Sequence, residues 1–338
     1  MKVSEIGEFG LIERLSRMAD KSKDKTQEAW KQLILGIGDD ATAYLNDSSI
    51  QLATVDSLVQ DIHFSLAYTS WKELGWKSLA VNLSDIAAMG GLPRYALVSL
   101  GLPGNTEVED VIALYRGMIE LAKQFGVAVV GGDTVGSPVL FISITVLGSA
   151  NNGKGRLLKR SAAKPGDEIA VTGHLGASAA GLEMLTKHLH FSVRDTAQLK
   201  NAHLKPYPRI TEGRLLVESG VRCGMDISDG LIGDLTHICQ KSHVGALIDT
   251  NLVPISLPVK TCFGKRALEM VLTGGEDYEL LFTTDKRVMS KIKKAIQCPV
   301  TVIGEITADK SNEVKLIDSH GKQVKIKKTG WDHFRIRT

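Results

Sequence analysis

The sequence predicts two domains of the α/β or α+β class, and three observations lead to that prediction. The chain has 338 residues, which exceeds one average domain and suits two of roughly 150 residues. Strand-like and helix-like apolar patterns alternate in both halves. The alternation breaks between residues 149 and 168, where Gly, Asn, Lys and Pro accumulate. We therefore expect a first domain over residues 1–150 and a second over residues 151–338.

In the first half, apolar residues recur at helical spacing in three segments, and each segment ends in a polar stretch or at glycine. Short apolar runs between them are of strand length. The elements expected here are, in order, a helix at 5–20, a strand at 51–56, a helix at 71–89, a strand at 95–100, a helix at 106–125, and strands at 127–130 and 140–147.

The second half repeats this alternation after the break. A polar loop through residues 206–209, which contains two prolines, separates its first two helices. The expected elements are a strand at 168–172, helices at 177–188, 210–219 and 230–241, a strand at 278–283, a helix at 286–295 and a strand at 301–306. No short-period repeat interrupts them.

Composition narrows the class of protein. The chain is 43% hydrophobic and 23% charged, as in an ordinary soluble globular protein, and its net charge of +3 is too small to indicate a nucleic-acid partner. The four cysteines, Cys223, Cys239, Cys262 and Cys298, lack CxxC spacing, so we expect no disulfide framework. No N-terminal apolar run and no membrane-length apolar stretch is present, and we expect a cytoplasmic protein.

Two glycine-rich segments resemble nucleotide motifs but fit them poorly. Residues 36–41 match GxGxxA, yet Asp39 and Asp40 occupy positions where a dinucleotide phosphate would be repelled; acids in a glycine turn fit a metal better. Residues 148–154 match GxxxxGK, but Gly155 stands where a P-loop needs Ser or Thr to bind Mg²⁺. An interdomain loop is the better interpretation of the second segment.

The most informative feature is a set of carboxylates in glycine-rich or helix-start settings. They are Asp39, Asp40, Asp56, Asp85, Asp133, Asp226, Asp229, Glu276 and Asp277. Each one alone is compatible with a turn residue or a helix cap. Asp56, Asp133 and Asp226 follow apolar strand-like runs, and Asp85 lies inside an apolar helix, where an unpaired charge is costly. With few basic residues nearby in sequence, these acids indicate Mg²⁺ and phosphoryl transfer without a P-loop.

Five blocks of sequence resemble the thiamine-monophosphate kinase family, in the family's order and over nearly the whole chain. They are Gly36-Ile-Gly-Asp-Asp-Ala, Asn82-Leu-Ser-Asp-Ile-Ala-Ala-Met-Gly, Gly131-Gly-Asp-Thr, Asp226-Ile-Ser-Asp-Gly-Leu and Gly274-Gly-Glu-Asp-Tyr-Glu-Leu. Gly7-Glu-Phe-Gly-Leu-Ile and Gly330-Trp-Asp-His-Phe fit as well. Aminoimidazole ribonucleotide synthetase and selenophosphate synthetase, of the wider superfamily, share the acidic residues but not all the blocks.

The resemblance implies an aminoimidazole-ribonucleotide-synthetase-like fold with two α/β domains, the N-terminal sheet dimerising and the C-terminal domain completing the nucleotide and substrate site. It implies transfer of the ATP γ-phosphate to thiamine monophosphate, several Mg²⁺ ions and a homodimer. The metal ligands it implies are Asp40, Thr54, Asp56, Asp85, Asp133 and Asp226. Asp229 would hold a further ion, and Asp39 and Val55 would assist, for instance through the main chain. The implied ATP contacts are Tyr115, Gly132, Asp133, Arg160 and Ser228, and the implied substrate contacts are His63, Glu276 and Trp331.

Without the resemblance, several of these residues also fit ordinary structural roles. Tyr115 and Trp331 fit packing roles, Arg160 a solvated loop, His63 an ordinary surface or core histidine, and Glu276 a turn. Some relatives have a hydroxyl residue at the position of Val55 and a Tyr at the position of Trp331.

The acceptor phosphate of the implied reaction has a second pKa near 6, so it is largely ionised at pH 7 and needs no general base. Positioning and charge neutralisation would supply the catalysis. Trp331 offers a cation–π face to a thiazolium ring.

Two other functions remain compatible with the same residues. One is an ATP-dependent enzyme of the superfamily that acts on a different acceptor, in which the blocks at 274–280 and 330–334 would not shape a thiamine pocket. The other is a thiamine or metal carrier that binds without releasing ADP.

Overall fold

The computed structural model describes residues 50–150 and 156–324, together with residues 1–2, 5, 11, 14–15, 17–24, 26–35 and 43–44 of the N-terminal segment. It divides into two compact units, Met1–Ile86 with Gly91–Gly155, and Ala87–Gly90 with Arg156–Thr338. Each unit contains one main sheet and several helices, so the predicted mixed α/β fold with a sheet in each half is confirmed. The acidic turn at 36–41 and the segment 325–338, with Trp331, lie outside the described residues.

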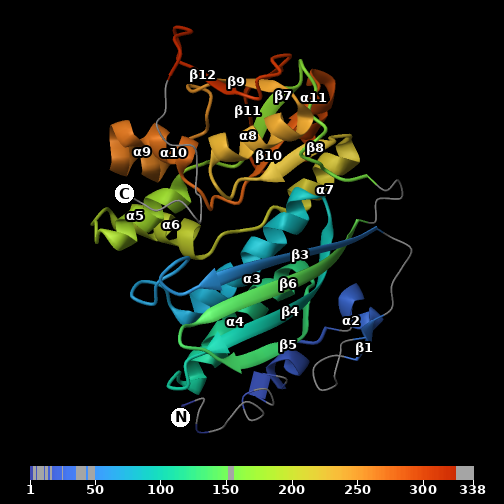
Figure 1. Cartoon of the computed structure of the whole chain (residues 1–338), viewed down its shortest axis with the longest axis vertical. Helices are drawn as coiled ribbons and strands as arrows, with labels where there is room; N and C mark the ends of the chain where they lie inside the picture. The colour runs from blue at the N-terminus through green and yellow to red at the C-terminus, as the bar shows by residue number, and fades with distance from the viewer. Residues whose placement is uncertain are drawn as a thin grey trace. The chain divides into compact units, whose positions relative to one another are not determined.

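The first unit is a four-stranded sheet covered on one face by two helices (Figure 1). Its elements are β3 (Ile50–Val59), α3 (Trp71–Ala88), β4 (Leu92–Leu102), α4 (Val108–Phe125), β5 (Ala128–Gly136) and β6 (Phe141–Ala150), preceded by α2 (Glu28–Gln32), β1 (Leu33–Leu35) and β2 (Ala43–Tyr44). The strand order is β3-β6-β4-β5, antiparallel except for the parallel pair β4 and β5.

Two glycines let α3 and α4 cross closely. A Cβ atom on Gly75 would lie 1.8 Å from the main-chain oxygen of Leu114, and one on Gly117 would lie 1.9 Å from that of Lys72. Nearly every residue of α3 from Leu74 onward is buried, because the sheet and α4 surround it. Four polar residues of α3 are therefore buried: Lys77, Ser78, Asn82 and Ser84.

The second unit contains a six-stranded sheet of order β12-β9-β11-β7-β10-β8, antiparallel except for β12 and β9. Its strands are β7 (Glu168–Thr172), β8 (Cys223–Asp226), β9 (Gly245–Asp249), β10 (Leu280–Thr284), β11 (Val300–Thr307) and β12 (Val314–Ile317). Every residue of β8 and β10 is buried. Its helices are α5 (Ala177–Thr186), α6 (Val193–Leu204), α7 (Ile210–Ser219), α8 (Leu231–Ser242), α9 (Leu257–Phe263), η1 (Gly264–Arg266), α10 (Ala267–Thr273) and α11 (Lys286–Ala295).

Two apolar clusters organise this unit. The larger one lies between α8 and the sheet and includes Leu235, Ile238 and Val171, each completely buried. A smaller one joins α5, α6, α9 and α10 through Ala180, Leu199 and Met270. Within the part of the chain that the structure describes, no helix is both long and apolar enough to span a membrane.

The structure corrects several sequence expectations. The strands predicted at 51–56 and 127–130 run on to Val59 and Gly136, so Asp56 and Asp133 lie inside strands rather than at their ends. The partners β6 and β4 continue beside them, so main-chain pairing carries both strands past the apolar run. Helices α6, α9 and α10 and strands β9 and β12 were not predicted. Helix α6 has few apolar residues, and the other four elements are only four to seven residues long.

We predict that Gly117→Ala destabilises the protein by about 1–3 kcal/mol, because the added methyl group would overlap the Lys72 carbonyl where the helices cross. Gly136→Ala is the matched control, since a Cβ atom there meets nothing within 4 Å. Urea denaturation of both variants measures the difference. Equal stability of the two would contradict the close crossing.

Candidate active site

In the first unit, strand β3 and helix α3 place four polar side chains against each other. Thr54 and Asp56 are two residues apart on β3 and so share the face that α3 covers. Asn82 and Asp85 are three residues apart and share one side of α3. The Thr54 hydroxyl donates to Asp85 Oδ2, and the main-chain N–H of Asp56 donates to Asn82 Oδ1 at 3.0 Å.

The carboxyl groups of Asp56 and Asp85 repel one another in this layer. Burial, and secondly the charge of Asp85, raises the pKa of Asp56 from 3.8 to about 6. Above that pH the folded protein holds two like charges close together, and a bound cation would relieve the repulsion. The donor set consists of carboxylate, hydroxyl and amide oxygens, which suits Mg²⁺. Among the described residues no three His, Cys, Asp or Glu side chains form a metal-binding group.

The Gly-Gly-Asp-Thr block lies in β5. Asp133 pairs with Ser99 of β4, which pairs in turn with Ser143 of β6. These paired residues lie one position along the sheet from those that pair across the strands with Asp56. Because successive side chains of a strand point to opposite faces, the exposed Asp133 side chain lies on the face opposite to Asp56. Gly132 has φ +153°, and a Cβ atom on it would lie 1.9 Å from the Val98 carbonyl oxygen, so only glycine fits.

Three further predicted residues of this unit lie in different environments. Val55 is 59% exposed on the face opposite Thr54 and Asp56. Because its side chain is apolar, it could offer a metal only its main-chain oxygen. Tyr115 is 5% exposed on α4, and burial raises the pKa of its hydroxyl well above the usual value. His63 follows β3, and its Nδ1 accepts a hydrogen bond from the Val59 N–H at 3.1 Å. In the neutral form the ring proton is therefore on Nε2.

In the second unit, one buried carboxylate shapes the loop that follows β8. Asp234 Oδ2 accepts hydrogen bonds from the N–H groups of Ser228, Asp229 and Gly230 at 3.1–3.2 Å. Burial, followed by the charges of Asp226 and Asp229, raises the pKa of Asp234 to about 8. Its Oδ1 is buried and makes no hydrogen bond to the described residues. The charges of Asp226 and Asp229 thus oppose ionisation of Asp234, and a cation near these acids would favour it.

The loop 274–279 is joined to this acidic loop by main-chain hydrogen bonds. The N–H of Glu276 donates to the Ser228 carbonyl at 2.7 Å, and the N–H of Tyr278 donates to that of Ile227 at 2.9 Å. Glu276 and Tyr278 have left-handed backbones, with φ +65° and +51°, which few non-glycine residues adopt. A Cβ atom on Gly275 would lie 2.2 Å from the Ser228 oxygen. The glycine permits the approach that brings Glu276 beside Ser228.

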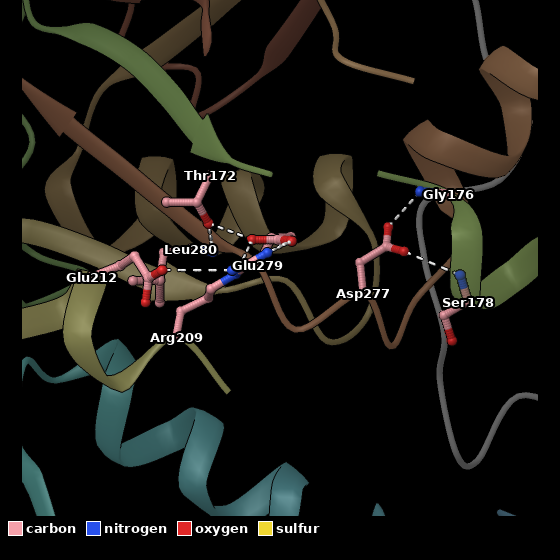
Figure 2. A network of polar contacts seen from close by, with 8 residues as sticks. All are labelled: Thr172, Gly176, Ser178, Arg209, Glu212, Asp277, Glu279 and Leu280. Carbon is pink, nitrogen blue, oxygen red and sulfur yellow. Dashed lines mark hydrogen bonds and ion pairs between the residues drawn. The ribbon is translucent and has the colours of Figure 1, made fainter. Parts of the chain in front are cut away.

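Asp277 holds the start of helix α5, as Figure 2 shows. Its carboxylate accepts from the Gly176 N–H at 2.7 Å and the Ser178 N–H at 3.3 Å, which are donors left unpaired at a helix N-terminus. Burial nevertheless raises its pKa to about 7. Asp277 thus anchors the loop through its side chain and leaves the neighbouring Glu276, with 29% of its side chain exposed, to face outward.

Glu279, the last acid of the block, is paired with Arg209 (Figure 2). The Arg209 guanidinium donates to both carboxylate oxygens of Glu279, and the Thr172 hydroxyl donates to Oε2 at 2.6 Å. Burial opposes the charge on Arg209, but Glu279 outweighs it and raises the pKa of Arg209 well above its usual value. Arg209 lies in the segment 206–209, predicted as a polar loop, and joins that loop to the sheet.

The remaining predicted residues divide between exposed and undescribed positions. Arg160 is exposed, and its carbonyl accepts a hydrogen bond from the Ser242 hydroxyl at 2.8 Å. Asp39, Asp40 and Trp331 lie outside the described residues. Sequence reasoning missed Asp234, Arg209, Glu279 and His203. The last of these lies on α6, whose start is marked by a Ser192-x-x-Asp195 capping box, a signal that could have revealed the helix.

Comparison with known proteins decides the family. The model of the N-terminal domain of AIR synthase related proteins matches residues 38–150, and that of their C-terminal domain matches residues 164–317. A thiamine-monophosphate kinase of Bacillus subtilis (strain 168) is 37% identical over 308 residues, 89% of this chain and 94% of the relative. The chain belongs to the thiamine-monophosphate kinase family. A member of the family from Escherichia coli (strain K12) is 38% identical over 335 residues, 97% of this chain and 98% of the relative.

Solved structures agree with this assignment to the thiamine-monophosphate kinase family. The family member from Stenotrophomonas maltophilia K279a is 33% identical, with a TM-score of 0.80, over 94% of this chain and 98% of that one. A structure of AaThiL complexed with AMPPCP and TMP is 34% identical, with a TM-score of 0.76, over 99% of both chains. The E. coli hydrogenase maturation protein HypE, 19% identical with a TM-score of 0.74 over 97% of this chain and 99% of that one, shares the fold.

We predict that Asp56→Asn raises the melting temperature of the metal-free protein at pH 8, because it removes one of two repelling charges. The pKa of Asp56 is higher in the folded than in the unfolded state, so its effect on stability is unfavourable and grows as the pH rises from about 4 to about 6. At pH 4 the two proteins should therefore differ much less. Differential scanning calorimetry measures both melting temperatures. Added Mg²⁺ should stabilise the native protein more than the variant. If Asp56→Asn raised the melting temperature of the metal-free protein equally at both pH values, the repulsion would be contradicted.

We also predict that Arg209→Met lowers the free energy of unfolding by about 3–5 kcal/mol, because it leaves the buried Glu279 carboxylate without its cation. The matched control is Arg214→Met, which breaks an exposed ion pair with Glu218 and should cost about 0.5 kcal/mol or less. Urea denaturation compares the two. A similar loss in both variants would show that the Glu279 pair has no special role.

Proposed function

We propose that the protein transfers the γ-phosphate of ATP to thiamine monophosphate, forming thiamine diphosphate and ADP. The observation that carries the proposal is the carboxylate layer of the first unit, where Asp56 and Asp85 lie close together and burial, followed by the charge of Asp85, raises the pKa of Asp56. Membership of the thiamine-monophosphate kinase family supports the choice of substrate. An oxygen of the substrate phosphate attacks the γ-phosphorus in line as the bond to the ADP oxygen breaks.

Several Mg²⁺ ions belong to the proposal, and the residues present fit them. In the first unit we assign Asp40, Thr54, the Val55 main chain, Asp56 and Asp85 as ligands, together with Asp133, which would hold a separate ion on the opposite face of the sheet. In the second unit we assign Asp226 and Asp229. Bound Mg²⁺ would neutralise phosphate oxygens and so lower the repulsion between two anions. The unpaired Asp234 Oδ1 and the raised pKa values of Asp56 and Asp234 support this assignment.

The protein's own groups would position the two anions. We assign the Gly132 main chain, the Ser228 hydroxyl, Tyr115 and Arg160 as ATP contacts. The N–H of His63 at Nε2 is the donor we assign to the substrate phosphate, since Nδ1 is occupied by Val59. Glu276 and Trp331 are assigned to the organic part of the substrate. An acceptor that is already ionised needs no general base, so positioning dominates.

A homodimer and a cytoplasmic location complete the proposal. The face of the first sheet away from α3 and α4 carries exposed Val55 and Val135, 59% and 50% exposed, and offers apolar surface to a second copy. Cys223 and Cys239 are buried as free thiols, which suits a reducing compartment.

The test is incubation of purified protein with ATP, Mg²⁺ and thiamine monophosphate, with chromatography to separate the products. Thiamine diphosphate should form one-for-one with ADP, and EDTA should abolish the reaction. ATP binding without diphosphate formation would favour a superfamily enzyme with another acceptor, and thiamine binding without ADP release would favour a carrier. Either result would overturn the proposal.

We predict that Asp85→Asn and Asp133→Asn each lower kcat roughly 100-fold or more, because each removes a charge that would hold Mg²⁺ on phosphate. Glu109→Gln, at an exposed position of α4, is the control and should retain the native rate. Circular dichroism checks that all three variants fold. Near-native turnover in both aspartate variants would contradict the assigned ligands.

A further inference from the structure

A buried histidine lies directly behind Glu276 in the second unit. The side chain of His203 is 2% exposed, and its Nδ1 lies 3.3 Å from Glu276 Oε2 and 3.1 Å from the Ser178 hydroxyl. An ionised carboxylate can only accept a hydrogen bond. The contact with Glu276 is therefore favourable when Nδ1 carries the ring proton, which it shares between the carboxylate and Ser178 Oγ.

Helix packing fixes the position of this imidazole. A Cβ atom on Gly181 would lie 2.2 Å from the Leu199 carbonyl oxygen and 3.0 Å from His203 Cβ, so α5 and α6 touch along this line. Leu199 and His203 are four residues apart and share the buried side of α6. Ser178, in the first turn of α5, is 1% exposed. Two packed helices thus hold both polar groups still.

Glu276 has a rigid backbone and a long side chain. Its left-handed φ of +65° and the hydrogen bond from its N–H to Ser228 fix the main chain. Its side chain, 29% exposed, would otherwise sample many rotamers and lose that freedom on binding a ligand. A fixed donor behind the carboxylate removes part of this cost beforehand, which is the usual benefit of preorganisation.

We propose that His203 is a positioning residue, which holds the Glu276 carboxylate in the rotamer that receives the organic part of the phosphorylated substrate. The inference rests on the proposed function for the identity of that substrate. His203 acts through Glu276, and Ser178 holds the imidazole from the other side. Removal of the donor at Nδ1 should weaken substrate binding while leaving the use of ATP unaltered.

The test compares His203→Leu with His203→Asn, because the asparagine amide keeps an N–H donor near the place of Nδ1 and leucine has the same size without it. We expect His203→Leu to raise the KM for thiamine monophosphate roughly five- to tenfold, with kcat and the KM for ATP within twofold of native values. His203→Asn should recover most of that loss. His190→Leu, at an exposed position, controls for the substitution itself.

A double-mutant cycle with Glu276→Gln separates positioning from general destabilisation. Calorimetry with a non-hydrolysable ATP analogue measures the Kd for thiamine monophosphate. If His203 acts through Glu276, His203→Leu should change this Kd much less in a protein that already carries Glu276→Gln. Ser178→Ala replaces His203→Leu in the cycle if the latter does not fold. The inference would be overturned if His203→Leu left the KM for thiamine monophosphate unchanged, or if it had its full effect in the Glu276→Gln background. Failure of His203→Asn to recover the loss would also overturn it. Absence of kinase activity in the native protein would instead overturn the proposed function.

Discussion

The acidic residues of each unit are subject to one physical constraint, which is the cost of keeping ionised carboxyl groups near one another in a partly buried environment. Burial is the largest contribution to the raised pKa values of Asp56, Asp234 and Asp277, which reach about 6, 8 and 7. For all three, neighbouring acids add to it. Because a bound cation offsets the repulsion between nearby carboxylates, a fold that holds these acids close together favours cation binding.

Main-chain groups, rather than cationic side chains, hold most of these acids. The N–H groups of residues 228–230 surround Asp234, and those of Gly176 and Ser178 surround Asp277. Amide donors fix a carboxylate without supplying a positive charge, so each of these acids is negative only where the pH exceeds its raised pKa. The exception is Glu279, which Arg209 neutralises. Within one seven-residue block, the three acids therefore differ: Glu276 faces outward, Asp277 anchors a helix and Glu279 joins the sheet to a loop.

The sequence was sufficient to predict the mixed α/β fold, because the fold follows from local patterns. Apolar periodicity predicts α3 and α4, and acids beside glycines or inside an apolar helix are conspicuous in a single chain. Contacts between distant segments could not be predicted. The facing of Asp56 and Asn82 depends on how α3 lies under β3, and the assignment of Asp133 to the opposite face depends on strand register. His203 was missed because α6 is mostly polar and short of apolar residues.

The close fit between the loops 226–230 and 273–279 links residues that are about fifty positions apart in the chain. Gly275 touches the Ser228 oxygen, Gly230 touches Thr273, and three main-chain hydrogen bonds join the segments. Neither loop can change its path without a matching change in the other. An engineer who moves the substrate-facing loop of one family member into another should therefore transplant both segments as a pair. By the same logic, a homologue that inserts a residue in one loop needs a compensating alteration across the interface.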